Sequence, residues 1–97
     1  MKIEGVLWRT RFVEKLAAKH AVDIDEVEEI LFGNPFVRFW EKGDVRGEDL
    51  YVAYGQSDVG RYLLVFFIRK SGNIALPISA RDMTDSERRY YRGQKTD

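Results

Sequence analysis

Short apolar runs alternate with glycine-containing turns through the second half of the chain, and this pattern constrains the fold most strongly. The runs span residues 36–40, 49–54, 61–69 and 74–78. The third run is nearly continuous in apolar residues, as expected of a central strand covered on both faces. Pro77 in the fourth run favours an edge strand or a bulge. Turns between successive strands predict a four-stranded antiparallel meander.

Two helices are expected before these strands. Residues 10–20 carry apolar side chains at helical spacing. Asp23 and Glu26 have the spacing of a capping box, in which each end of the motif satisfies a free backbone N–H of the other. Val22 and Val27 have the spacing of a hydrophobic staple across that cap. We therefore predict a second helix that starts after Asp23.

The two ends of the chain complete the expected architecture. Residues 1–8 favour a short edge strand or an extended arm, and residues 93–97 a frayed polar tail. Thr84 and Glu87 form another capping-box pattern, which predicts a C-terminal helix. The fold class is thus α+β: one domain of residues 1–97, with a four-stranded antiparallel meander, two N-terminal helices and a C-terminal helix.

Composition excludes several classes of function. The sequence has no cysteine, so disulfide scaffolds, Cys-ligated zinc and cysteine nucleophiles are ruled out. The acidic run 23–29 falls at a helix start and lacks the spacing of a calcium loop, and the glycines form no phosphate-binding loop. We expect no metal and no cofactor. The longest apolar run, 62–68, is far shorter than the ~20 residues of a membrane helix, and no secretion signal is evident, so a cytoplasmic location is expected.

Charge is distributed unevenly along the chain. Residues 1–60 carry 8 basic and 12 acidic side chains, whereas residues 61–97 carry 8 basic and 4 acidic ones. Tyrosines lie among the basic residues of the second segment, and arginine with tyrosine suits single-stranded or loop RNA. A solvated helix face explains the same pattern without a ligand. His20 is the natural candidate for proton transfer, because only histidine has an unperturbed pKa near neutrality (~6.5), although a helix C-terminus also favours it.

Several short motifs resemble the BrnT toxin family. They are residues 78–84 (ISARDMT), 87–91 (ERRYY), 19–22 (KHAV), 34–35 (NP) and 60–63 (GRYL). The motifs occur in the family's order and at comparable intervals from about residue 12 to residue 92. Several matching strings in the same order are much more specific than any one of them.

The resemblance implies a toxin of a type II toxin–antitoxin pair. Such proteins have a RelE-like fold and act as metal-independent ribonucleases that arrest translation. A partner protein that also binds operator DNA neutralises them. We therefore expect an antitoxin of the ribbon-helix-helix type, RNA as substrate, no membrane partner, and a homodimer or a heterotetramer with the antitoxin.

The resemblance also implies the site residues. The catalytic candidates are Lys19, His20, Arg81 and Glu87, with Arg61 and Arg69 as basic neighbours that bind RNA. The pattern of arginines and tyrosines adds Arg88 and Tyr91 as RNA-binding candidates. Attack of a ribose 2′-OH on the adjacent phosphate needs a base, an acid for the leaving oxygen, and cations for the developing charge. His20 or Glu87 would take the proton, while Arg81 and Lys19 would hold the phosphate.

The sequence departs from the family pattern at three places. Ala21 stands where glycine is usual, and Leu50 and residues 76–77 stand where arginine is common. The alternative hypothesis is therefore a non-catalytic RNA- or protein-binding module of the same fold. A structural or interaction domain with no role in nucleic-acid binding is a third possibility.

Overall fold

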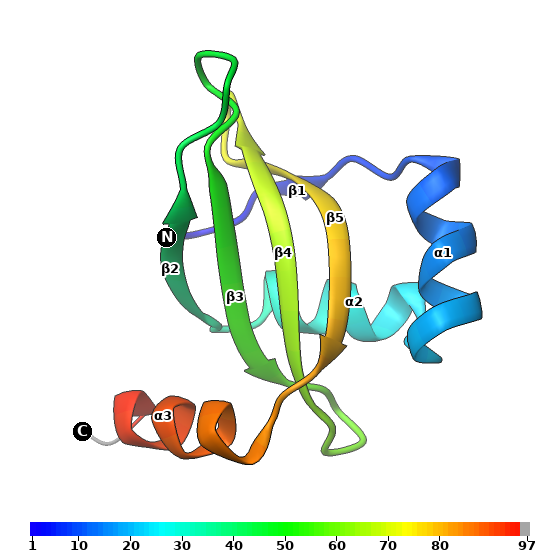
Figure 1. The fold of residues 1–97 in the computed structure, drawn as a ribbon, viewed down its shortest axis with the longest axis vertical. Helices are drawn as coiled ribbons and strands as arrows, with labels where there is room; N and C mark the ends of the chain where they lie inside the picture. Colours follow the sequence, from blue (N-terminus) through cyan, green and yellow to red (C-terminus); the bar gives the residue numbers. More distant parts are fainter. Residues whose placement is uncertain (96–97) are drawn as a thin grey trace.

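The computed structural model describes residues 1–95, except for the side chains of Ala17, Lys19, His20 and Lys95. Its elements, in chain order, are β1 (Gly5–Val6), α1 (Thr10–His20), α2 (Ile24–Phe32), β2 (Phe36–Glu41), β3 (Leu50–Gln56), β4 (Tyr62–Lys70), β5 (Ile74–Asp82) and α3 (Asp85–Lys95). The α+β class is confirmed. In Figure 1, α2 crosses behind the strands, while α3 lies at the ends of β3 and β5 where those strands finish.

The sheet has five strands in the order β1-β5-β4-β3-β2. Strands β2 to β5 form the expected antiparallel meander. The prediction of four strands is wrong because Gly5 and Val6 pair in parallel with Ile74 and Ala75. The Leu7 N–H extends this contact by donating to the Ala75 carbonyl (2.8 Å). Of the two alternatives predicted for residues 1–8, an edge strand or an extended arm, the structure has the strand; two residues are too few to show an alternating pattern that would have decided between them.

Strand β5 is longer than expected and carries a bulge. In its pairing with β4, Phe66 is opposite Ser79 and Phe67 is opposite Pro77. Ile78, which lies between Pro77 and Ser79, is therefore unpaired. A proline removes one ladder hydrogen bond, so a bulge next to Pro77 accommodates it. Beyond the bulge the strand continues to Asp82. The end of the ISAR motif therefore lies on a strand rather than in a loop.

One face of the sheet is covered by α1 and α2. Its core contains side chains from both helices and from three strands: Phe12, Leu16, Val22, Val27, Ile30, Leu31, Ala53, Leu63, Val65, Phe67, Ala75 and Ala80. The capping box at Asp23 is present with both of its contacts, and Val22 and Val27 are both buried. We call this side the covered face.

The opposite face is covered only in part, by α3. Its smaller core comprises Val52, Tyr54, Leu64, Met83 and Tyr91. Thr84 and Glu87 make both contacts of the expected capping box, at 2.8 and 3.2 Å, and α3 then runs to Lys95. Gly93–Lys95, which the sequence pattern places in a tail, are therefore helical. We call this side of the sheet the open face.

Candidate functional site

The end of β5 places Arg81 on the open face. Arg81 lies opposite Leu64 in the antiparallel pairing of β5 with β4. Directly opposed residues point to the same side of a sheet, and Leu64 belongs to the core under α3. The guanidinium carbon of Arg81 lies 5.8 Å from the centroid of the Phe66 ring, which is within the range of a cation–π contact. Strand pairing thus sets a cation against an aromatic surface at this edge of the face.

Glu87 fixes the direction of the Arg81 side chain. Arg81 donates Nη1 to Oε1 (2.7 Å) and Nη2 to Oε2 (2.9 Å) of the carboxylate, a bidentate arrangement. Glu87 Oε1 also accepts the Thr84 backbone N–H (2.8 Å). One carboxylate therefore caps α3 and orients Arg81 at the same time. The two side chains remain 35% and 23% exposed, so a ligand can reach the pair.

This contact determines the charge state of both groups. The hydrogen bonds from Arg81 lower the pKa of the Glu87 carboxyl to about 2, against its partial burial and with help from the Thr84 N–H. The same hydrogen bonds raise the pKa of Arg81 above its ordinary value. A carboxylate with so low a pKa is a weak base at neutral pH. Glu87 is therefore suited to hold Arg81 in position rather than to accept a proton.

A second arginine lies on the same face, and the sequence analysis missed it. Arg38 pairs with Val52 across β2 and β3, so it points toward the open face. Its Nη1 donates to the Tyr54 hydroxyl (3.3 Å), and its guanidinium carbon lies 4.8 Å from the centre of the Tyr90 ring. The hydrogen bond to Tyr54 raises the pKa of Arg38. No carboxylate pairs with Arg38 among the described residues.

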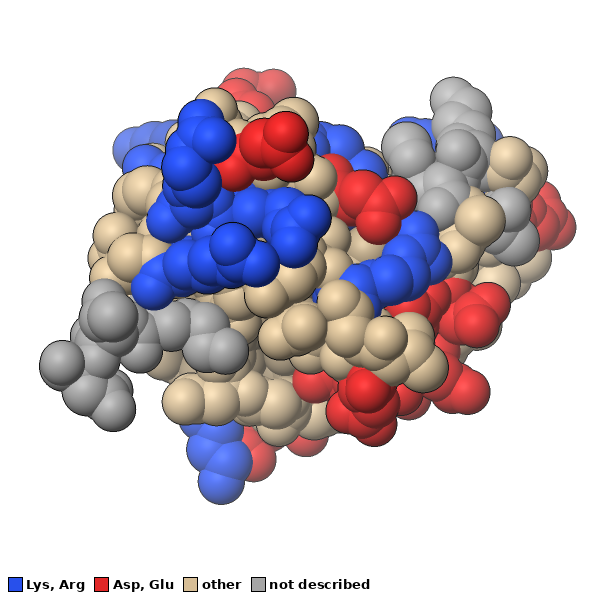
Figure 2. All heavy atoms as spheres, turned by 90° about the horizontal axis from the view of Figure 1, so that it is seen from below, with Lys and Arg blue, Asp and Glu red and all other residues tan. Residues whose placement is uncertain are grey.

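Helix α3 contributes the other basic and aromatic groups. The guanidinium groups of Arg88 and Arg92 lie 4.3 and 5.2 Å from the centre of the Tyr62 ring, and Arg92 donates to its hydroxyl. This hydrogen bond from Arg92 lowers the pKa of Tyr62. Tyr91 is 3% exposed and stacks on Tyr54, so it belongs to the core under α3. In the view from below, basic side chains gather on the side of α3 (Figure 2).

Arg61 lies in a network of hydrogen bonds at the same end of the sheet as Arg81, but on the side of the covered face. Its guanidinium donates to the Ala21 carbonyl (2.7 Å), to Glu26 Oε1 (3.1 Å) and to both carboxylate oxygens of Asp82. Glu26 is nearly buried, with its side chain 11% exposed. Arg61 therefore joins the junction of α1 and α2 to the ends of β4 and β5, and the structure does not place it beside Arg81 on the open face.

Arg69 lies at the opposite end of the sheet. It pairs with Ala75 near the turn between β4 and β5, and its guanidinium donates to the Asn73 side chain. Ala75 belongs to the core of the covered face. Arg69 lies five positions along β4 from Leu64, the partner of Arg81, which corresponds to roughly 16 Å. Arg69 and Arg81 therefore do not act on one group.

The side chains of Lys19 and His20 lie outside the described part of the structure, but their backbone position is known. Both residues belong to the last turn of α1. Ala21, which follows His20, accepts a hydrogen bond from Arg61, and Arg61 also binds Asp82, which follows Arg81. A single arginine side chain therefore links the end of α1 to the end of β5. That Lys19 and His20 act together with Arg81 stays a prediction from the motifs.

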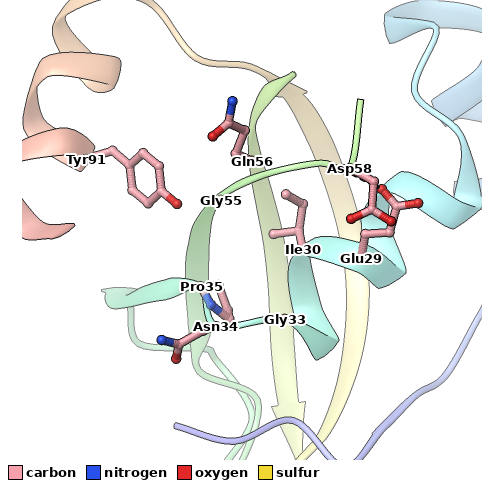
Figure 3. Close-up of a pocket in the computed structure, with 9 residues that line it drawn as sticks. All are labelled: Glu29, Ile30, Gly33, Asn34, Pro35, Gly55, Gln56, Asp58 and Tyr91. Carbon is pink, nitrogen blue, oxygen red and sulfur yellow. Dashed lines mark hydrogen bonds between the residues drawn. The ribbon is translucent and has the colours of Figure 1, made fainter. Parts of the chain in front are cut away.

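A pocket elsewhere among the described residues has a different chemistry. It measures about 400 Å³ and lies between the end of α2, the turn after β3, and α3 (Figure 3). Its lining residues are Glu29, Ile30, Gly33, Asn34, Pro35, Gly55, Gln56, Asp58 and Tyr91. Two carboxylates and no lysine or arginine line this pocket, so it is unsuited to a phosphate.

Two further properties bear on function. Among the side chains that the structure describes, no group of three or more His, Cys, Asp or Glu is arranged to hold a metal ion. None of the helices in the described chain is both long and apolar enough to cross a membrane.

Comparison with known proteins gives one consistent result. A family model described as the ribonuclease toxin BrnT of type II toxin–antitoxin systems matches residues 8–87. The crystal structure of the Brucella abortus ribonuclease toxin BrnT is similar in fold, with a TM-score of 0.58 and 18% sequence identity over 84% of this chain and 97% of that chain. Comparison with curated proteins gives no match. The chain belongs to the BrnT family of ribonuclease toxins of type II toxin–antitoxin systems.

Proposed function

We propose that this protein is an endoribonuclease toxin whose substrate phosphate binds at Arg81. The observation that carries this proposal is the bidentate pair of Arg81 and Glu87 at the partly exposed edge of the open face. Arginine has five N–H donors in one plane, and the Nε–H and the second Nη2 N–H of Arg81, which Glu87 does not use, form an edge that matches a phosphate. Glu87 holds that set in one orientation before substrate arrives, which reduces the cost of ordering it during the reaction.

The proposed reaction is attack of a ribose 2′-OH on the adjacent phosphorus. The O2′–P bond forms, the P–O5′ bond breaks, the leaving 5′-oxygen takes a proton from a water molecule, and the products are a 2′,3′-cyclic phosphate and a 5′-OH. Arg81 and Lys19 balance the charge that develops on the phosphate oxygens. His20 accepts the 2′-OH proton, because the ordinary pKa of a histidine lies near neutrality, whereas the contact with Arg81 lowers the pKa of Glu87 to about 2. Glu87 is a positioning residue for Arg81 in this scheme.

Cleavage of labelled RNA by purified variants tests the assignment. Arg81→Ala should lower the rate at least a hundredfold, because loss of one donor to a transition-state oxyanion costs roughly 10²–10³. His20→Ala should lower it by roughly 10²–10⁴. Arg46→Ala is the matched control, since Arg46 is an exposed arginine in the loop between β2 and β3. Equal rates for Arg81→Ala and Arg46→Ala would contradict the proposal.

The proposal includes independence from metal ions. Cations of the chain itself supply the positive charge at the phosphate, so full activity should persist in excess EDTA. Identification of a 2′,3′-cyclic phosphate at the new 3′ end would support the 2′-OH mechanism. A 5′-phosphate product, or loss of activity in EDTA that Mg²⁺ restores, would contradict it.

In the cell, the proposed outcome of cleavage is arrest of translation in the cytoplasm. We propose that a ribbon-helix-helix antitoxin neutralises the protein, in a heterotetramer or with a toxin homodimer. Expression alone should stop growth, and co-expression with the small protein encoded next to it should restore growth. Growth arrest should also disappear in the Arg81→Ala variant.

A non-catalytic binding module is the second candidate, and one observation favours it. Leu50 and Leu76 replace arginines that are common in the family, and Leu76 is 3% exposed within the apolar packing. The open face therefore carries fewer cations than the family pattern implies. Growth arrest that survives both His20→Ala and Arg81→Ala, without RNA cleavage, would favour this candidate.

A further inference from the structure

We propose that the open face binds a nucleotide beside the cleaved phosphodiester, with its base stacked on Trp40 and its phosphate on Arg38. This inference rests on the proposed function, because it names where the rest of a single-stranded RNA lies once Arg81 holds one phosphate. Neither residue is part of the motifs that carry the family resemblance.

The first support is the exposure and placement of Trp40. Its side chain is 47% exposed, although an indole of this size is usually mostly buried. Trp40 lies at a register shift in β2, where Phe39 pairs with Tyr51 and Glu41 pairs with Leu50. Bulges at sheet edges often redirect a side chain next to a functional site. Here the bulged residue is an exposed aromatic ring.

The second support is that Trp40 and Arg81 contact the same ring. The Trp40 and Phe66 ring centroids are 5.3 Å apart with planes at 83°, and Arg81 lies 5.8 Å from the Phe66 centroid. The Phe66 ring thus lies between the Trp40 indole and the Arg81 guanidinium, and the distance between these two groups is within the span of a dinucleotide. A phosphate on Arg81 would leave the next base close to Trp40, and unpaired bases stack readily on such rings.

The third support is the charge of Arg38. It lies two residues before Trp40 and is held by a hydroxyl and an aromatic ring, neither of which neutralises its charge. Arg61, in contrast, is bound to two carboxylates. An RNA strand that passes from Arg81 across Phe66 to β2 therefore meets a second cation, Arg38. Charge complementarity on this face favours a polyanion over a protein segment.

Fluorescence provides a direct test, because Trp8 and Trp40 are the two tryptophans of the chain. Trp8 packs on Phe12 and donates to Glu28, away from the open face. In a Trp8→Phe variant, a short single-stranded RNA with methylated 2′-hydroxyls should quench the remaining emission. The same RNA as a duplex should quench it much less, because its bases are already stacked. Absence of quenching by the single strand would overturn the inference.

Affinity measurements with matched variants give the second test. Trp40→Ala should weaken binding of the methylated RNA roughly tenfold, as loss of one stacked base does, and Trp40→Phe should restore most of it. Phe39→Ala is the matched control, since Phe39 is the neighbouring residue, is 55% exposed, and packs edge-on against Tyr51 of the covered side. Arg38→Gln should reduce the salt dependence of binding by about one counterion, and Arg46→Gln should leave it unchanged.

The possible outcomes separate the inference from the proposed function. If the wild type cleaves RNA and Arg81→Ala does not, but Trp40→Ala and Phe39→Ala bind RNA equally well, the inference alone fails. It also fails if Trp40→Ala retains RNA affinity but loses the cognate antitoxin, because the surface then belongs to a protein partner. If the wild type neither binds nor cleaves single-stranded RNA, both fail.

Discussion

The two faces of the sheet show how one small domain separates stability from recognition. On the covered face, side chains of alternate strand residues are fully buried under α1 and α2. On the open face, α3 covers only one end, and aromatic rings and arginines beyond it stay partly exposed. Burial of those rings would stabilise the fold by roughly 1.5–3 kcal/mol each. The proposed RNA site uses these partly exposed rings as its stacking surface.

Neighbouring phenylalanines on β4 allow the largest test of this difference. Phe67 points to the covered face and is fully buried, whereas Phe66 points to the open face and is partly exposed. We expect Phe67→Ala to lower the free energy of unfolding by about 4 kcal/mol, through lost burial and a cavity. Phe66→Ala should cost less than half as much. Urea denaturation measures both, and equal losses would show that the faces do not differ in packing.

The two arginines at the same end of the sheet provide the next test. Arg61→Ala leaves the nearly buried Glu26 without its cation, so we expect a loss of about 2 kcal/mol in unfolding free energy. Arg81→Ala should cost about 1 kcal/mol or less, because both members of its ion pair are partly exposed. The comparison is contradicted if Arg81→Ala proves the more destabilising substitution.

The Arg81–Glu87 pair should also appear in the dependence of stability on pH. The folded pKa of Glu87, about 2, lies below its ordinary value of 4.5. The unfolded chain therefore binds the proton first, and the contribution of Glu87 is present above pH 4.5 and is lost as pH falls toward 2. Because the pair is partly exposed, we expect this contribution to be about 1 kcal/mol. Glu87→Gln should flatten the curve of unfolding free energy over that interval; an unchanged curve would disprove the role.

Local signals were sufficient to predict much of the fold. The capping boxes at Asp23 and Thr84 depend on residues three positions apart, so their contacts could be read from the sequence. The meander followed from turn residues between apolar runs. For residues 1–8 the sequence did not decide between an edge strand and an extended arm, because the two residues of β1 carry no periodicity and their pairing with β5 depends on contacts about 70 positions away.

The site could be predicted only in part, because faces depend on strand register. The capping-box pattern predicted the place of Glu87 at the start of α3. The contact of Glu87 with Arg81 depends instead on the extension of β5 past the bulge at Pro77. Arg38 lies in the middle of a predicted strand, two positions from Phe36, and residues two positions apart point to the same face of a sheet. This spacing was the available signal that Arg38 shares a face with aromatic rings. Its contact with Tyr90 required the position of α3, which no local pattern provides.

Arg69 supplies the test with the smallest expected effect. It is an exposed arginine near the end of β4, and its guanidinium donates to Asn73 in the adjacent turn, at the end of the sheet away from α3. We expect Arg69→Ala to change the unfolding free energy by no more than about 0.5 kcal/mol, as for most surface substitutions. RNA cleavage should also stay near the wild-type rate, because a cation roughly 16 Å along the strand cannot touch the phosphate held by Arg81. A loss of cleavage comparable to that of Arg81→Ala would mean that RNA crosses the sheet from end to end, and the recognition surface would then no longer be confined to the open face near α3.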